Sequence, residues 1–351
     1  MCRFALLFNL DETRALNWAA AHVKVRVPDV EFAKFYAEEW ESGDGSAERF
    51  AALKEAVRRA DVVFFDVHRH SPRSGELASL LDTLANTVIV LGGGPEFLRL
   101  VRMGSFHGRD FPMVRAADKK AERVSSPDAT ALYEAFGRPQ GGPPRRLRQM
   151  QEWLKRLGGA LPLGKMRHMR NWLTVLEYYA EGGEDNLEAM FLFVLKEYCG
   201  RKVEVPPPRK RPETGIYLPP AGYTADFQEW VRVVRPSGEH PTVGILFYGG
   251  QGTETSREVV DALAHELRPY ANVLPVFGKV DSLLDAAERY FLVNGRRTVD
   301  AVVALNYFRL GGGPMGGRVK ETFRFLEALG VPVFMGYIGF KTETSRWKAA
   351  T

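Results

Sequence analysis

Short apolar segments alternate with amphipathic segments near the N-terminus of the chain, and this alternation constrains its fold more than any other feature. Residues 4–8 form an apolar run of strand length, and residues 61–67 form another that is rich in β-branched and aromatic residues. Between such runs, apolar residues recur at helical spacing. This alternation is typical of a parallel sheet covered by helices on both faces. The predicted strands are residues 4–8, 30–36, 61–67 and 87–91, and the predicted helices begin at residues 11, 46 and 71.

The same pattern returns in the C-terminal part of the chain. We expect strands at residues 242–248, 272–277, 299–305 and 331–337, with helices that begin near residues 255, 281 and 319. Ligands of doubly wound sheets bind outside the carboxyl ends of the strands. The loops that should hold a ligand are therefore residues 248–253, 277–280, 306–316 and 337–343.

The middle of the chain has a different pattern. A Gln-Gly-Gly-Pro-Pro sequence at residues 140–144 indicates a linker, and residues 145–198 show helical periodicity without a clear strand. A proline-rich connector follows at residues 205–212. The predicted fold class is α/β, with two doubly wound parallel-sheet units joined by a helical segment. We expect domains at residues 1–137, 138–205 and 206–351.

Composition excludes several classes of protein. Hydrophobic residues make up 45% and charged residues 26% of the chain, which is the balance of a globular protein and not of a disordered one. No apolar run approaches the ~20 residues that span a bilayer, so we expect no membrane span. The two cysteines allow at most one disulfide, and such low cysteine usage makes the cytoplasm the expected location.

The charge is +5 and is concentrated in basic clusters at residues 138–170 and 201–211. Such clusters could attract an anionic substrate, an acidic partner or nucleic acid, or they could be solvated helix faces and a linker. The sequence has no zinc-finger spacing and no RNA-recognition signature, so we expect no nucleic-acid partner.

Two glycine clusters, residues 92–94 and 311–313, follow predicted strands, as a phosphate-binding loop would. Neither fits a Walker A or a dinucleotide-binding motif, so a nucleotide site is weakly supported. The glycines could instead form tight turns in which two backbones approach closely. A third interpretation is a flat surface against a planar ligand.

Polar and aromatic residues at the predicted strand ends are the candidate binding residues. His68 and His70 alternate at one strand end and would face the same side, where they could contact a ligand or lie on the surface. No third metal ligand is evident near them, and no nucleophile set or catalytic residue can be assigned. The remaining candidates are Tyr248, Asn306, Tyr307, Phe308, Arg309 and Tyr337, although aromatic residues at such positions often only cap a core.

Six groups of short motifs follow one another along most of the chain. They are GPEFLRL at 94–100 with MGSF at 103–106; LP at 161–162, Lys165, RNW at 170–172 and GGEDNL at 182–187; TGIYLP at 214–219; LPVF at 274–277; FRLGGGP at 308–314; and KTET at 341–344 with Trp347. In this order they resemble the large subunit of the cobaltochelatase and magnesium-chelatase family.

The resemblance implies a part in the ATP-driven insertion of a divalent metal ion into a tetrapyrrole. Co²⁺ or Mg²⁺ would be a substrate, and the resemblance leaves the choice between them open. No tightly bound cofactor is expected in this chain, because a separate AAA+ ATPase and its associated subunit would use ATP and Mg²⁺. The flat macrocycle with carboxylate edges would suit a surface of glycine, aromatic and basic residues. The expected tetrapyrrole-binding residues are His68, His70, Tyr248, Asn306, Tyr307, Phe308, Arg309, Gly311, Gly312, Gly313 and Tyr337.

The chain is much shorter than the large subunits that it resembles. It is therefore expected to be an N-terminal part or a short relative, without chelatase activity of its own. One alternative is a non-catalytic docking module for the ATPase subunits, in which Arg145, Arg146 and Arg148 contact an acidic partner. Another is an unrelated two-lobed protein that binds a small ligand.

Overall fold

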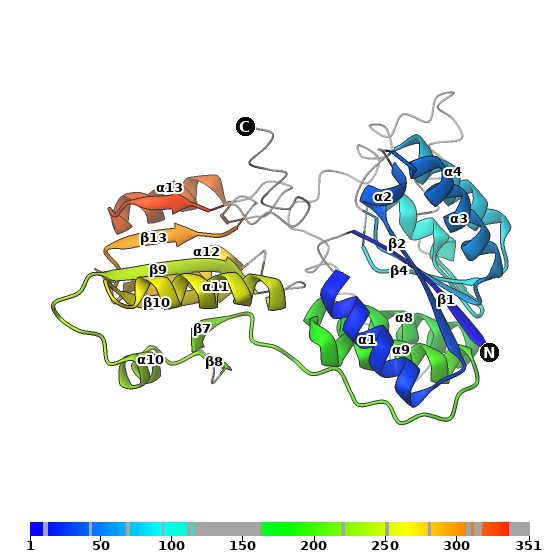
Figure 1. The fold of residues 1–351 in the computed structure, drawn as a ribbon, viewed down its shortest axis with the longest axis horizontal. Helices are drawn as coiled ribbons and strands as arrows, with labels where there is room; N and C mark the ends of the chain where they lie inside the picture. Colours follow the sequence, from blue (N-terminus) through cyan, green and yellow to red (C-terminus); the bar gives the residue numbers. More distant parts are fainter. Residues whose placement is uncertain are drawn as a thin grey trace. The chain divides into compact units, whose positions relative to one another are not determined.

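Two compact units make up the computed structural model (Figure 1). Among the described residues, the first unit extends to Arg209 and the second begins at Lys210. Each unit has a six-stranded sheet of its own. The structure describes residues 1–9, 13–41, 44–67, 71–92, 95–110, 114, 163–218, 222–249, 253–279, 282–306, 310–311 and 318–336.

The first sheet has four parallel strands followed by an antiparallel hairpin. Its order is β2(Val30–Tyr36), β1(Cys2–Phe8), β3(Val62–Phe65), β4(Thr87–Val90), β5(Arg102–Met103) and β6(Phe106–His107). The four parallel strands are those that apolar runs predict. The hairpin is absent from the prediction because strands of two residues are too short to show a period.

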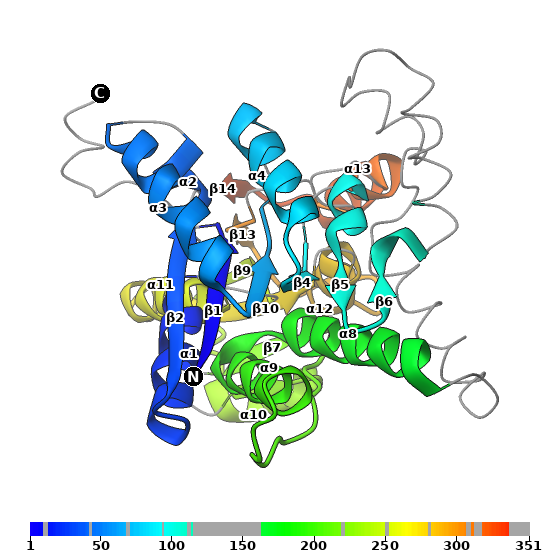
Figure 2. The same cartoon turned by 90° about the vertical axis from the view of Figure 1, so that its right-hand side faces the viewer.

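Helices cover both faces of the first sheet (Figure 2). On one face lie α1(Thr13–Arg26), α8(Leu163–Glu181) and α9(Gly183–Tyr198), and on the other lie α2(Ala37–Glu41), α3(Ser46–Arg59) and α4(Pro72–Thr83). Phe191 of α9 packs against Phe4 and Phe64 on the sheet, with ring centroids 6.0 and 5.3 Å apart. The Trp172 indole of α8 donates to the Val90 carbonyl at 3.1 Å. Short 3₁₀ turns at Pro95–Leu100 and Gly108–Asp110 flank the hairpin.

The described helices of the middle segment thus belong to the core of the first unit. A disulfide between Cys2 in β1 and Cys199, which directly follows α9, joins the sheet to these helices. The residues from Arg201 to Pro212 form neither helix nor strand, as the proline content predicts. The predicted domain boundary at 137 and 138 lies outside the described residues.

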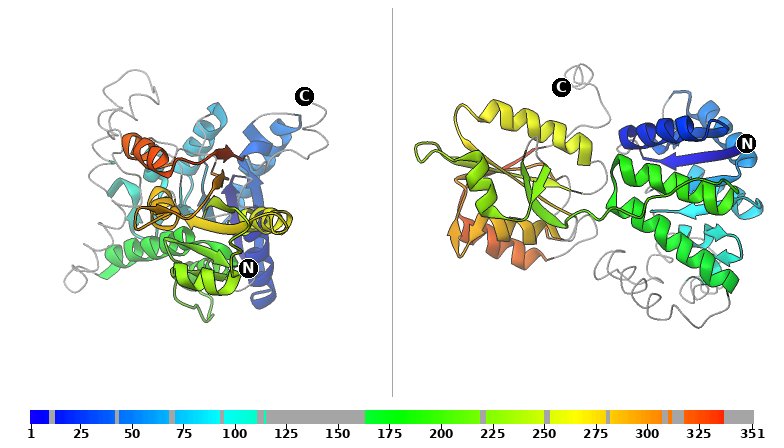
Figure 3. Two further views of the ribbon diagram at one scale, coloured as in Figure 1. Left: turned by 90° about the vertical axis from the view of Figure 1, so that its left-hand side faces the viewer. Right: turned by 90° about the horizontal axis from the view of Figure 1, so that it is seen from below.

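The second sheet also has four parallel strands, with an antiparallel pair beside them. Helices lie on both of its faces (Figure 3). Its order is β14(Val333–Met335), β13(Ala301–Ala304), β9(Thr242–Tyr248), β10(Asn272–Gly278), β7(Thr214–Leu218) and β8(Gly222–Thr224). One face packs against α11(Thr253–Leu267), and the other packs against α10(Phe227–Val234), α12(Leu283–Phe291) and α13(Val319–Leu329). A small hairpin, β11(Leu292–Val293) and β12(Arg296–Arg297), follows α12.

These sheets confirm the predicted α/β class, with a correction in detail. Both sheets are mixed and not fully parallel, because each carries two antiparallel strands at one side. No helix in the described part of the chain is long and apolar enough to cross a bilayer.

Candidate binding site at the carboxyl edge of the second sheet

The strand order of the second sheet determines where a ligand would bind. The chain passes from β9 to β10 on one side and later returns to β13 on the other side of β9. The carboxyl ends of β9 and β13 therefore diverge into loops that run in opposite directions, which is the usual ligand position in doubly wound sheets. Tyr248 is the last residue of β9 and Gly249 follows it, and Leu305 and Asn306 follow β13.

Two polar side chains from the sequence prediction lie at this point. Asn306 is only 3% exposed, so its amide is held within the protein at the end of the strand. Tyr248 is partly buried at the end of the neighbouring strand. An amide offers both a donor and an acceptor, and a tyrosine offers a ring and a hydroxyl. This pair suits a ligand that is flat and bears polar groups.

The glycines of this edge have close neighbours. A Cβ on Gly249 would lie 2.3 Å from Cδ2 of Phe277, and a Cβ on Gly278 would lie 2.7 Å from Cα of Leu283. The Gly249 amide donates to the Gly278 carbonyl at 3.0 Å. Glycine therefore allows the ends of β9 and β10 to pack closely, whether or not a ligand is bound.

Gly311 occupies a tight turn beside the N-terminus of α13. Its φ of 86° lies in the left-handed region, and a Cβ there would lie 2.6 Å from Oγ1 of Thr322. The Gly311 carbonyl accepts from the Arg318 amide at 2.8 Å, and Thr322 donates to the Leu310 carbonyl at 2.9 Å. The structure thus supports the tight-turn interpretation of this glycine.

Arg318 is a cation near this turn, and its charge is already balanced. Its guanidinium donates to Asp285 of α12 and, at 2.6 Å, to Glu321. Hydrogen bonds to these two carboxylates raise the pKa of Arg318 above its ordinary value. An anionic ligand would have to compete with both carboxylates, so Arg318 alone does not make an anion site.

Aromatic residues on the α11 face of the sheet form a packed cluster. Tyr223 lies 4.7 Å from Phe277 and 5.5 Å from Tyr217, measured between ring centroids. The Tyr217 hydroxyl donates to Asp261 at 3.1 Å, and burial followed by this carboxylate raises the pKa of Tyr217 to about 12. These rings stabilise the core beneath the edge and are not presented to a ligand.

The first sheet has a corresponding point between β1 and β3, where the sequence prediction named His68 and His70 but not Asp66. Asp66, directly after β3, is 1% exposed and accepts a hydrogen bond from the Tyr179 hydroxyl of α8. Asn9, directly after β1, donates to the Asp66 carbonyl at 3.1 Å. The signal for Asp66 was present in the sequence, because an acidic residue that directly follows a fully apolar strand must find a partner on burial.

The structure describes only some of the predicted site residues. Tyr248, Asn306 and Gly311 lie at the carboxyl edge, at the ends of β9 and β13 and in the turn before α13. The others lie outside the described residues: His68, His70, Tyr307, Phe308, Arg309, Gly312, Gly313 and Tyr337, and the docking candidates Arg145, Arg146 and Arg148. Within the described ranges, no three His, Cys, Asp or Glu side chains gather as metal ligands.

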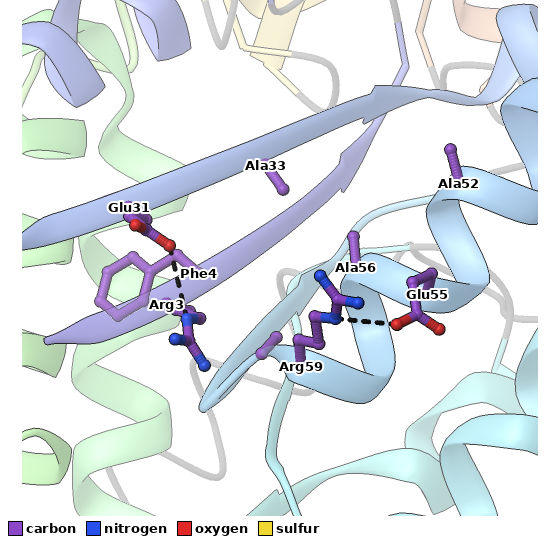
Figure 4. A pocket seen from close by; sticks show the side chains of 9 residues that line it. Arg3, Phe4, Glu31, Ala33, Ala52, Glu55, Ala56 and Arg59 are labelled. Carbon is purple, nitrogen blue, oxygen red and sulfur yellow. Dashed lines mark ion pairs between the residues drawn. The ribbon is translucent and has the colours of Figure 1, made fainter.

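A groove of about 700 Å³ lies elsewhere, beside the amino-terminal halves of β1 and β2 (Figure 4). Its charged side chains pair with one another: Arg3 with Glu31 at 3.4 Å, and Arg59 with Glu55 at 2.8 Å. The rest of its lining is mainly alanine. The groove is remote from the carboxyl edge of its sheet, and its balanced charges favour no ligand.

Comparison with known proteins identifies relatives over most of the chain. Residues 176–351 match the family CobN/Magnesium Chelatase, and residues 3–173 match a domain family of unknown function, DUF3479. The H subunit of magnesium chelatase from Rhodobacter capsulatus is 27% identical over 92% of this chain and 26% of its own length. Its counterpart from Cereibacter sphaeroides is 26% identical over 86% of this chain and 25% of its own length.

A solved structure is also similar in part. The catalytic subunit of cobaltochelatase from Mycobacterium tuberculosis superposes with a TM-score of 0.47 and 16% identity, over 99% of this chain and 22% of that one. The chain spans about a quarter of the length of the two magnesium-chelatase relatives. Since the family match covers half of the sequence, up to residue 351, this chain belongs to the CobN/magnesium chelatase family.

Proposed function

We propose that this chain is a tetrapyrrole-binding part of the large subunit of a metal chelatase. The observation that carries the proposal is the carboxyl edge of the second sheet, where Tyr248 and the buried Asn306 end neighbouring strands. Family membership and the magnesium-chelatase relatives support the same class of ligand. The substrates would be a tetrapyrrole and Co²⁺ or Mg²⁺.

The described residues suit a planar macrocycle in a specific way. The macrocycle would lie over the ends of β9 and β10, which Gly249 and Gly278 allow to pack closely against each other. The Tyr248 ring would lie against the macrocycle, and the Asn306 amide would bond a polar substituent. The predicted Arg309 would pair with a carboxylate edge.

Titration with a tetrapyrrole tests the proposal. Protoporphyrin IX and a cobalt-free corrinoid should each be added to the intact chain, with ligand absorption and tryptophan fluorescence as readouts. Binding at micromolar concentration is expected for at least one of them, and the tighter ligand indicates whether the chain belongs with magnesium or cobalt insertion. Absence of any spectral change with both ligands would contradict the proposal.

A pair of tyrosines offers a matched test of the location. Tyr248→Ala removes a ring at the carboxyl edge and should weaken binding about tenfold, because a stacked ring contributes about 1 kcal/mol or more. Tyr270→Ala removes a ring that is 74% exposed just before β10, at the opposite edge of the same sheet. Equal affinities for the two variants would place the ligand elsewhere.

We also propose that an AAA+ ATPase and its associated subunit are partners, since this chain carries no Walker motif and metal insertion needs an energy source. A pull-down with the purified motor subunits at low and high salt tests this. Reversal of the charges of Arg145, Arg146 and Arg148 should abolish the interaction, and unchanged binding would exclude that surface. We propose the cytoplasm as the compartment, where the Cys2–Cys199 bond of the structure would be kept reduced. Alkylation in intact cells should then find both cysteines as thiols, and an intact disulfide would contradict this location.

A further inference from the structure

Strand β14 is an edge strand whose side chains are all apolar and exposed. Val333, Phe334 and Met335 are 39%, 61% and 68% exposed. Successive residues of a strand point to opposite faces, so the described residues leave apolar side chains exposed on both faces of the sheet at this edge. Among the described residues, β14 pairs with β13 on one side only, and its other side presents backbone donors and acceptors.

The first unit shows how the equivalent strand is normally covered. The order β2-β1-β3-β4 in the first sheet corresponds to β10-β9-β13-β14 in the second. The fourth strand, β4, is followed outward by β5 and β6, and its Val88, Ile89 and Val90 are at most 2% exposed. The same position in the second sheet has no such neighbour in the described part of the chain.

The side chains of β14 also differ from those of an edge strand that is protected against pairing. The outer strand β2 of the first sheet carries Glu31 and Lys34, and charged residues of this kind discourage edge-to-edge pairing. Strand β14 carries no charge. An exposed edge strand without charged residues is typical of a sheet to which another segment adds a further strand.

Helix α13, which precedes β14 in the chain, also exposes apolar side chains. Val319 and Phe323 are 49% and 61% exposed and lie one turn apart. Arg318 pairs with Asp285 of α12, so its side of α13 faces α12. Phe325 of the same helix is buried in the core, and at about 100° per residue Phe323 lies roughly 160° around the helix from it, on the outer flank.

We propose that β14 and this outer flank of α13 bind a β-strand, with its covering element, from the remaining part of a chelatase large subunit. The magnesium-chelatase relatives are about four times the length of the region that they share with this chain. The incoming strand would pair with β14 and become the fifth parallel strand of the second sheet, a number found in other doubly wound sheets. It would be apolar on both faces, since Val333, Phe334 and Met335 would flank it.

Site-specific photo-crosslinking in cells of the source organism tests this proposal. A photoreactive phenylalanine replaces Phe323 in the full chain, and mass spectrometry identifies the captured peptide. The expected product is an apolar strand from the remaining large-subunit sequence, on the same polypeptide or on another. Capture of a second copy of this chain, or of an unrelated protein, would overturn the proposal.

Edge variants provide the control. Phe334→Lys should lower the crosslink yield at least about tenfold, because it places a charge where an apolar strand must pack. Tyr270→Lys alters an exposed aromatic residue outside this surface and should leave the yield unchanged. Both positions are exposed, so neither variant should prevent folding.

Hydrogen exchange supplies a second readout that does not depend on crosslinking chemistry. The amides of Val333 to Met335 should exchange rapidly in the isolated chain and become protected in the assembled large subunit. Protection already present in the isolated chain would show that the edge is covered from within, and would exclude the proposal. These tests need no tetrapyrrole, so their failure can be distinguished from failure of the proposed function.

Discussion

Individual residues at the strand ends are held by hydrogen bonds within the fold. The Tyr179 hydroxyl donates to the buried Asp66, and the Arg318 guanidinium is shared by Asp285 and Glu321. A ligand at the carboxyl edge of either sheet would therefore have to compete with contacts that these groups already make within the protein. The contribution of a single residue to stability is therefore best tested at positions that have a structural role and no proposed role in binding.

Gly108 is a residue whose role is structural. A Cβ at this position would lie 1.7 Å from the Leu98 carbonyl oxygen, so Gly108→Ala must displace backbone. We expect a loss of more than about 2 kcal/mol in the free energy of unfolding, measured by urea denaturation. The control Gly75→Ala, in α4 with nothing within 4 Å, should be neutral or stabilise by about 0.5–1 kcal/mol. Equal effects of the two substitutions would contradict this packing.

His168 on α8 should make stability depend on pH. Burial and then Arg167 hold the pKa of His168 below its ordinary value, while its Nδ1 lies 3.0 Å from the Tyr198 hydroxyl. The unfolded chain then binds the proton more readily, so stability is full above the unfolded pKa and declines as pH falls toward the folded pKa. The unfolding free energy of the wild type should fall more from pH 8 to pH 5.5 than that of His168→Asn. Parallel pH profiles would exclude this role.

At the scale of elements, the first unit depends on contacts between its two ends. Helix α9 packs against β1 through Phe191 and Phe4, and the Cys2–Cys199 disulfide fastens the same pair of elements. The described part of the predicted helical middle, residues 163–198, thereby forms one of the two helical layers that cover the sheet. Its apolar stripes face the sheet, which explains why they are apolar.

The disulfide should contribute measurably to the oxidised protein. Its cysteines are 197 residues apart, and removal of a bridge that closes a long loop costs about 2–5 kcal/mol. Cys199→Ser should therefore lower the unfolding free energy by this amount in non-reducing buffer. Dithiothreitol should lower the wild type to the level of the variant and leave the variant unchanged. An oxidised wild type that is no more stable than Cys199→Ser would contradict the predicted contribution.

At the scale of the whole molecule, each unit has hydrophobic core clusters of its own. One core lies entirely within the first unit, and two smaller cores lie on the two faces of the second sheet. Separate cores should melt separately, because each core is formed by residues of one unit only.

Differential scanning calorimetry should show two transitions. Gly108→Ala should lower one of them, and Gly244→Ala should lower the other, because its Cβ would lie 2.8 Å from two ring atoms of Phe291. For units of this size, each kcal/mol corresponds to a shift of about 2–4 °C. A single transition that both substitutions lower equally would show that the units unfold together.

The sequence by itself determined the class of fold, because apolar runs of strand length and helical spacing are local properties. The predicted strands 30–36 and 242–248 coincide with β2 and β9, and the predicted helix start at residue 319 coincides with that of α13. The ordered motifs also indicated the family that the comparisons show. Binding by Tyr248, Asn306 and Gly311 stays a prediction, although their position at a strand edge follows from the strand pattern.

Only the tertiary structure decided which distant residues meet. The hairpin β5–β6 and the pair β7–β8 depend on sheet partners and not on any local period. The bond from Tyr179 to Asp66 joins residues 113 positions apart, and no spacing rule connects them. The exposure of β14 likewise follows from its place at the end of the strand order, because the same apolar sequence in a central strand would be buried.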